Sequence, residues 1–497
     1  MPRRSLGQAS LILLGSSWIH SGLGLLASVL IGRVLGPEAV GALALNLGLA
    51  GLVMAAAVPG FARAHLKRLA EGDNVGRCLG TMGLIQAGLA TILGLGLLVA
   101  WQTGALADAP AGAAVFIFIL GSQIALRLAD VFMQVFIVQE RVGTHAKILF
   151  SMRLLRLVAT VVVLVVAPSV TGIAATFLLE SVLTLIVAAS VLASGGIRPR
   201  APSRASLAGY WRFARPFLLI TPLALVQDSI DRVLVGHWAG LVAAGYYQIA
   251  RALFEVISGV MAPPGMLMFT RLSSLYAQRT PERDSAARRL FFSGLDKLLF
   301  LSTAMAVFFW VLAEPLLGAL YGLSFVAATP ALRILVLAAL GATLINPYTL
   351  VLQAQDEVAR FIPVNVVRFV VYVIALFVLI PGMIPGLPAA AAGAALARLL
   401  LILVPFWVWM GWTRELAGIP FYWRALTYFA GFALAVMVFH ALVSSAITLT
   451  GSRWAGDVLA GAVAFAVYVV WLLKVHPDTR ANFEYAMGLP LGLLNRR

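Results

Sequence analysis

Cysteine, acidic residues and charge of any kind are scarce in this chain of 497 residues. The single cysteine, Cys78, excludes an internal disulfide. Six scattered histidines exclude the spacing of a metal-ligand set, and no Walker A, Gly-x-Ser-x-Gly or H-E-x-x-H sequence is present. No hydrophilic stretch is long enough to hold a separate catalytic domain. We therefore expect neither an enzyme nor a bound metal or cofactor.

Hydrophobic sequence is abundant and makes up 61% of the chain. About fourteen hydrophobic stretches recur, each of about 20 residues, the length that crosses a bilayer core of about 30 Å as a helix. They begin near Leu11, Val40, Leu79, Gly112, Lys147, Val170, Phe213, Ala244, Gly294, Pro330, Ile362, Pro388, Ala425 and Ala455. The sequence thus predicts an all-α polytopic membrane protein with about fourteen transmembrane helices.

Lys and Arg outnumber Asp and Glu by 36 to 20, and they gather in every second gap between the hydrophobic stretches. One group follows the second stretch (Arg63, Lys67, Arg68, Arg77), another follows the sixth (Arg198, Arg200, Arg204, Arg212, Arg215), and the alternate gaps hold Arg33, Arg333 and Arg453. The positive-inside rule then places both termini in the cytoplasm, and we expect a multi-pass protein of the plasma (inner) membrane. Since these segments carry most of the net charge of +16 and contact anionic membrane lipids, we expect no nucleic-acid partner.

The chain contains an internal repeat. Gly32, Gly36, Gly41, Pro59 and Lys67 correspond to Gly236, Gly240, Gly245, Pro263 and Arg271 at an offset of 204, and Gln139, Glu140 and Val142 correspond to Gln355, Asp356 and Val358 at 216. An even number of helices in each copy gives both the same orientation, so we expect a pseudo-two-fold axis along the membrane normal. The predicted parts are two six-helix lobes (residues 1–197 and 213–411), a cytoplasmic linker (198–212), and two additional helices with a cytoplasmic tail (412–497).

Three matched positions in each copy are candidate gate or hinge residues. They are Gly32, Gly36 and Pro59 in the first copy and Gly236, Gly240 and Pro263 in the second. The glycines are four residues apart, a spacing that lets helix backbones approach closely. A gate where the lobes meet, ordinary helix packing and a turn requirement all remain open as explanations. The prolines lie at equivalent depth and end or kink their helices.

Two stretches carry a family resemblance. The first is Gly32-Arg33-Val34-Leu35-Gly36-Pro37-Glu38 with Gly41 and Pro59-Gly60, and the second is Leu320-Tyr321-Gly322, Phe325, Ala327-Ala328 and Leu332-Arg333-Ile334-Leu335. Over about residues 8–411, the chain resembles polysaccharide transporters of the multidrug/oligosaccharidyl-lipid/polysaccharide (MOP) superfamily. The resemblance implies two six-helix lobes that carry undecaprenyl-diphosphate-linked oligosaccharide to the outer leaflet, as Wzx-type flippases do. Fourteen-span members of the superfamily also accommodate the two additional helices.

Charged residues within the predicted spans are costly unless they face a partner or water. Three couples are spaced to pair on one helix face: Arg127 with Asp130, Asp228 with Arg232, and Arg251 with Glu255. Asp231 and Glu180 lie outside these couples. Structural ion pairs and coupling sites for Na⁺ or H⁺ both remain open as interpretations of these residues.

Arg153 and Arg156 are like charges on one face of a span, with no acid within one helical turn. The repeat places Arg368 at nearly the same depth in the second copy, and Arg398 follows in the next span. Guanidinium groups bind phosphate oxygens through two parallel hydrogen bonds, so we predict that these four arginines contact the substrate diphosphate in a central cavity. Pairing of Arg153 and Arg156 with Glu180, or contact with lipid headgroups, is the alternative.

The leading hypothesis is a flippase that moves a polyprenyl-diphosphate-linked oligosaccharide from the inner to the outer leaflet by alternating access. An ion-coupled drug or cation exporter of the same superfamily is the first alternative, and it requires acidic walls. A membrane-embedded glycan polymerase or ligase is the second, and it requires a large outer loop. The expected partners are the lipid-linked substrate, membrane lipids and a downstream polymerase or ligase.

Overall fold

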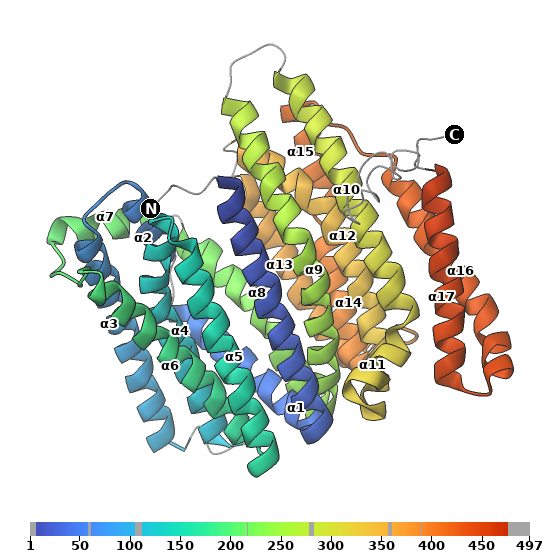
Figure 1. Ribbon diagram of the computed structural model, residues 1–497, viewed down its shortest axis with the longest axis horizontal. Helices are drawn as coiled ribbons and strands as arrows, with labels where there is room; N and C mark the ends of the chain where they lie inside the picture. The colour runs from blue at the N-terminus through green and yellow to red at the C-terminus, as the bar shows by residue number, and fades with distance from the viewer. Residues whose placement is uncertain are drawn as a thin grey trace. The chain divides into compact units, whose positions relative to one another are not determined.

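The computed structural model describes residues 6–57, 61–104, 112–215, 217–277, 283–355, 360–387 and 389–475, and contains no strand within them (Figure 1). The helices of the first half are α1 (Leu6–Ala57), α2 (Phe61–Ala70), α3 (Val75–Gln102), α4 (Ala113–Val138), α5 (Val142–Val166), α6 (Val170–Ser194), α7 (Arg204–Ala214) and α8 (Phe217–Trp238). Those of the second half are α9 (Gly240–Ala277), α10 (Arg283–Val311), α11 (Ala313–Tyr321), the 3₁₀ helix η1 (Leu323–Ala328), α12 (Thr329–Ala354), α13 (Phe361–Leu379), α14 (Ala390–Leu403), α15 (Phe406–Ala417), α16 (Ala425–Thr450) and α17 (Arg453–Val475).

The predicted all-α membrane fold is confirmed. Among the described residues, 11 helices are long and apolar enough to cross a membrane. The helix α1 contains two helical segments, since Gly36 interrupts it with non-helical dihedral angles, and α8 and α9 occupy the positions of the predicted seventh and eighth spans. The number of fourteen spans stays a prediction.

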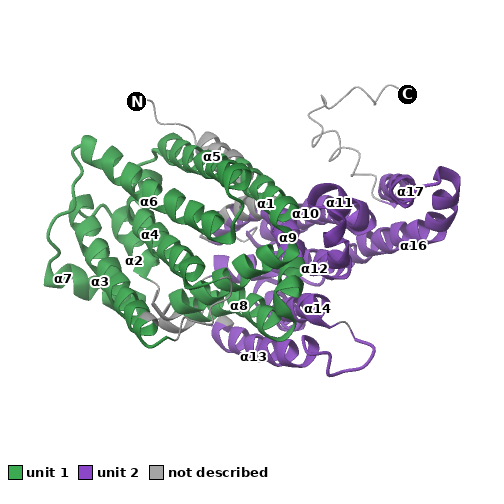
Figure 2. Cartoon of the chain, turned by 90° about the horizontal axis from the view of Figure 1, so that it is seen from below, with its two compact units in different colours: residues 1–248 green, residues 249–497 purple. Residues whose placement is uncertain are grey.

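The chain divides into two compact units, residues 1–248 and 249–497 (Figure 2). The helix α8 belongs to the first unit because it packs along α1. Equivalent helix pairs pack together within each unit: α4 with α6 and α5 with α6 in the first, and α12 with α14 and α13 with α14 in the second. The matched Gln139 and Gln355 both cap the C-terminus of a helix, α4 and α12 respectively. The predicted lobe boundaries stay a prediction.

The repeat is visible in two glycine turns. Gly36 has φ 77° and Gly240 has φ 84°, a backbone conformation that residues other than glycine rarely adopt. Each turn separates two long helical segments. A turn requirement therefore explains these two positions, whereas Gly236 packs against Leu45, whose Cδ2 would lie 3.0 Å from an added Cβ.

The matched Gly41 and Gly245 mark a close approach of backbones inside the first unit. A Cβ on Gly41 would overlap the Leu241 carbonyl oxygen, and a Cβ on Gly245 would overlap the Pro37 carbonyl oxygen. Pro37 and Leu241 are themselves 204 residues apart, so the two contacts are equivalent under the repeat. The small-residue contacts continue along α1 at Gly48, where an added Cβ would lie 2.8 Å from a Val233 methyl.

The remaining hinge candidates fall in less informative positions. Pro59 lies outside the described residues. The helix α9 continues through Pro263 to Ala277, so this proline does not end its helix. Gly32 is buried within α1. A gating role for any of the six positions stays a prediction.

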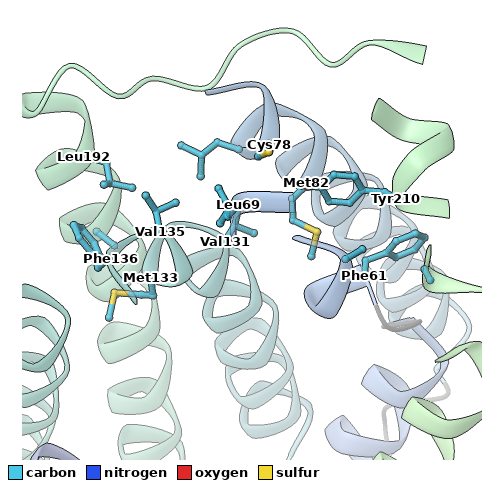
Figure 3. Packing of buried hydrophobic residues seen from close by; sticks show 14 of the residues in the cluster. Phe61, Leu69, Cys78, Met82, Val131, Met133, Val135, Phe136, Leu192 and Tyr210 are labelled. Carbon is cyan, nitrogen blue, oxygen red and sulfur yellow. The ribbon is translucent and has the colours of Figure 1, made fainter. Parts of the chain in front are cut away.

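A buried apolar cluster of the first unit joins α2, α3, α4, α5, α6 and α7 (Figure 3). The helix α7 of this cluster begins in the predicted linker, and a capping box between Ser203 and Ser206 closes its first turn.

His65 is fully buried in this cluster. Its Nε2 donates to the Val131 carbonyl (3.0 Å), and its Nδ1 accepts from the Tyr210 hydroxyl (2.9 Å). Burial lowers the pKa of His65 to about 4, so the ring is neutral at pH 7 and fastens α2 to α4 and α7.

Cys78 lies in this cluster with only 4% of its surface exposed, so it is a poor target for a topology reagent. The exposed Glu71, 42% accessible, is a better one. In a Cys78→Ala background, we expect Glu71→Cys to react with a membrane-impermeant maleimide in right-side-out vesicles only after the membrane is opened. Cys78→Ala alone is the unlabelled control. Labelling of the Glu71→Cys protein in sealed vesicles would reverse the predicted orientation.

Candidate substrate-binding cluster within the spans

Two arginines of α5 converge on one glutamate of α6. Arg153 Nη1 lies 3.3 Å from Glu180 Oε2, and Arg156 Nη1 lies 3.1 Å from the same oxygen. The arginines are three residues apart and so share a face of α5, and α5 packs directly on α6. The pairing with Glu180 that the sequence left open is therefore present. We call these three residues the arginine cluster.

The arginine cluster is enclosed by three helices of the first unit. Side-chain exposure is 20% for Arg153, 9% for Arg156 and 15% for Glu180. The Arg156 guanidinium lies 3.4 Å from the centre of the Phe177 ring, a cation–π contact. On the α1 side, Gly24 leaves room for Arg153, because an added Cβ would lie 2.6 Å from its Nη2.

The charges of the arginine cluster do not balance. Two guanidinium groups and one carboxylate leave an excess of one positive charge among apolar helices. His20 of α1 lies close enough that the charges of all three residues act on it. In addition, the Nε atoms of Arg153 and Arg156 are buried and have no hydrogen-bond partner in the described part of the chain. An anionic ligand would satisfy both the excess charge and the free donors.

The second unit carries arginines on the equivalent pair of helices. Arg368 of α13 is half-buried, and Arg398 of α14 is only 8% exposed. The two helices pack together, and the charge of Arg398 acts on Arg368. Each unit thus has arginines where the fifth and sixth predicted helices of its repeat meet. A shared central cavity for all four arginines stays a prediction.

Comparison with known families identifies the chain. A sequence model of the polysaccharide biosynthesis protein family matches residues 6–275, more than half of the 497 residues. This chain belongs to the polysaccharide biosynthesis protein family. A comparison with curated protein sequences finds no match.

The structure of this protein is similar to that of the lipid II flippase MurJ in its inward closed conformation. The TM-score is 0.70 at 12% identity, covering 93% of this chain and 99% of that one. A MATE family multidrug resistance transporter of the MOP superfamily is also similar, with a TM-score of 0.63 facing inward (15% identity, 82% and 98% coverage) and 0.57 facing outward (16% identity, 82% and 95%). At such identities the likeness shows the fold, and the polysaccharide family read from the sequence is confirmed by the family model.

The other predicted ion pairs have mixed outcomes. Arg127 and Asp130 pair at 3.8 Å, and Arg251 and Glu255 pair at 2.9 Å, as predicted. The pairing of Asp228 with Arg232 stays a prediction. Asp231 is fully buried on α8, where it accepts from the Tyr247 hydroxyl at 2.6 Å and from the backbone N–H of Arg232 at 2.8 Å. Each carboxylate oxygen of Asp231 therefore accepts a hydrogen bond from a neighbouring residue, which is consistent with a structural role.

The sequence did not predict the buried polar contacts of Asp296. Asp296 of α10 is 8% exposed, and its Oδ1 accepts from the Tyr422 hydroxyl at 2.7 Å and the Tyr428 hydroxyl at 2.8 Å. Thr303 and Tyr468, also buried, form a further hydrogen bond, which joins α10 to α17. These contacts hold the two additional helices, α16 and α17, against the repeat. An acid within an apolar run was the available signal, but nothing in the sequence pointed to its tyrosine partners.

Proposed function

We propose that this protein is a flippase that translocates a polyprenyl-diphosphate-linked oligosaccharide from the inner to the outer leaflet by alternating access. The observation that supports this most directly is the arginine cluster, in which Arg153 and Arg156 share the single carboxylate of Glu180. A diphosphate carries the opposite charge and presents oxygens in the geometry that guanidinium groups bind.

The sign of the excess charge separates this function from its closest alternative. An exporter of cationic drugs needs acidic groups to hold its substrate, and a positive cluster within the spans repels cations. At a span centre, an arginine costs about 2.5 to 3.5 kcal/mol on insertion scales. A protein that keeps an arginine without a compensating acid at such a position is expected to bind an anion with it.

Several finer points belong to the same proposal. Translocation is coupled to Na⁺ or H⁺ through acidic residues of the spans, with Glu180 and Asp130 as the candidates beside arginines. The protein lies in the plasma (inner) membrane with both termini in the cytoplasm. A downstream polymerase or ligase receives the oligosaccharide at the outer leaflet. The two extra helices are not assigned a part in transport.

Deletion of the gene in its host tests this proposal. We expect surface glycan to disappear and the lipid-linked oligosaccharide to accumulate in the membrane, with both effects reversed by the wild-type gene and not by an Arg153→Gln, Arg156→Gln double variant at matched expression. Susceptibility to cationic drugs should not change. Normal surface glycan together with increased drug susceptibility in the deletion strain would favour the exporter instead.

A further inference from the structure

The second unit contains a cavity of about 400 Å³ lined by α9, α10 and α12. Among the described residues, its lining includes no Asp, Glu, Lys or Arg. The polar groups are uncharged: they belong to Ser258, Thr343, Asn346, Thr349 and Gln353, and the remaining wall is apolar, with Phe269 as its aromatic member. This cavity therefore differs in kind from the arginine cluster, which is charged.

Most of the polar groups form one stripe on α12. Asn346, Thr349 and Gln353 follow at intervals of three and four residues, which places them on a single helix face. Asn346 and Gln353 are exposed although the helix is otherwise largely buried. Neither side-chain amide bonds to another residue in the described part of the chain. Two amides thus present donors and acceptors to the cavity, in a helix apolar enough to span a membrane.

Two further polar groups lie in the wall. Pro347 lies inside α12 and has no N–H, so the carbonyl of Thr343, one turn earlier, loses its usual helical donor. The Ser258 hydroxyl oxygen is buried and makes no hydrogen bond within the described residues. Unpartnered polar groups in a membrane span are costly unless a ligand or water satisfies them. The Ser258 hydroxyl and the amides of Asn346 and Gln353 therefore face one cavity without a partner among the described residues.

The geometry points to a sugar site: we infer that this cavity binds the uncharged hydroxyl groups of the oligosaccharide. This inference rests on the proposed function and adds to it. Neutral donors and acceptors together with an apolar and aromatic wall match the hydroxyl edges and C–H faces of a pyranose ring. A diphosphate would find no cation here, a cationic drug no acid, and a prenyl chain would leave the amides unsatisfied.

The test compares two ligands in the same variants. Asn346→Leu and Gln353→Leu remove one amide each at nearly constant size, and Thr448→Val removes a hydroxyl from α16 outside the cavity. We expect glycan export at matched expression to fall roughly fivefold for each leucine variant and on the order of 25-fold for the double, with Thr448→Val unchanged. Binding of farnesyl diphosphate, a probe without sugar, by the purified proteins should stay within about twofold of wild type.

Three outcomes would overturn the inference. Normal export by the double variant would remove the stripe from recognition. A parallel loss of farnesyl diphosphate binding would show that the cavity binds the diphosphate or that the substitutions distort the fold. Absence of export by the wild-type protein would refute the proposed function, and the sugar site with it. By contrast, wild-type binding of farnesyl diphosphate by an Arg153→Gln, Arg156→Gln protein would refute only the role of the arginine cluster, since the export ratio of the leucine variants would still decide the sugar site.

Discussion

Replacing Gly41 by alanine should lower the unfolding temperature of the purified protein by about 5 °C or more. The added Cβ would overlap the carbonyl oxygen of Leu241 in the first turn of α9, and Gly245→Ala should act alike through the carbonyl oxygen of Pro37. Both clashes involve backbone atoms, so no change of rotamer relieves them. The helices must instead move apart, which also opens the contact between the two copies of the repeat.

The matched control is Gly88→Ala on α3, where an added Cβ meets nothing within 4 Å. Alanine favours a helix over glycine by about 1 kcal/mol, so this control should unfold at the wild-type temperature or slightly above it. The unfolding temperature of all three variants is measured by following the loss of monodisperse protein on heating in detergent. Equal unfolding temperatures for Gly41→Ala and Gly88→Ala would refute the close approach of α1 and α9.

Removing an arginine of the arginine cluster should weaken the binding of farnesyl diphosphate, whereas removing its glutamate should not. Arg153→Gln and Arg156→Gln should each weaken binding by at least about tenfold, because each removes a charge-assisted contact and lets Glu180 neutralise the remaining arginine. Glu180→Gln keeps both arginines and removes their competitor, so binding should be maintained or become tighter. The unliganded Glu180→Gln protein should be less stable, since two like charges are left unopposed.

Arg127→Gln is the control for this series, because Arg127 has its own partner, Asp130, at 3.8 Å on the same helix. Arg153→Lys and Arg156→Lys keep the charge without the two-pronged geometry and should lie between the wild type and the glutamine variants. Equal losses of affinity in Arg156→Gln and Glu180→Gln would identify the cluster as a structural ion pair with no part in ligand binding.

The hydrophobic pattern and the repeat were enough to predict much of this fold. Lipid permits few backbone structures, so apolar stretches of the right length translate directly into helices. The offset of 204 residues also located equivalent backbone features, since Gly36 and Gly240 both have positive φ and Gly41 and Gly245 both approach a carbonyl. These features depend on the local chain and on glycine, which has no Cβ and whose positions can be read directly from the sequence.

The site was less accessible because it depends on contacts between helices. Spacing within α5 placed Arg153 and Arg156 on one face, but only the packing of α5 on α6 joins both to Glu180. A search for charge also passed over Asn346 and Gln353, which are neutral and distinguished only by facing a cavity. The burial of Cys78 by the linker helix α7 escaped notice for a similar reason, since a short polar segment gives a weak helical signal.

Translocation by the purified protein in liposomes tests the central claim most directly. Lipid-linked oligosaccharide extracted from the host is placed in the inner leaflet, and its appearance outside is followed with an impermeant glycosidase. We expect the wild-type protein to expose the oligosaccharide much faster than protein-free liposomes, and the Arg153→Gln, Arg156→Gln protein to remain near the protein-free rate. Exposure by the wild-type protein at the protein-free rate, in liposomes that hold the folded protein, would contradict the account.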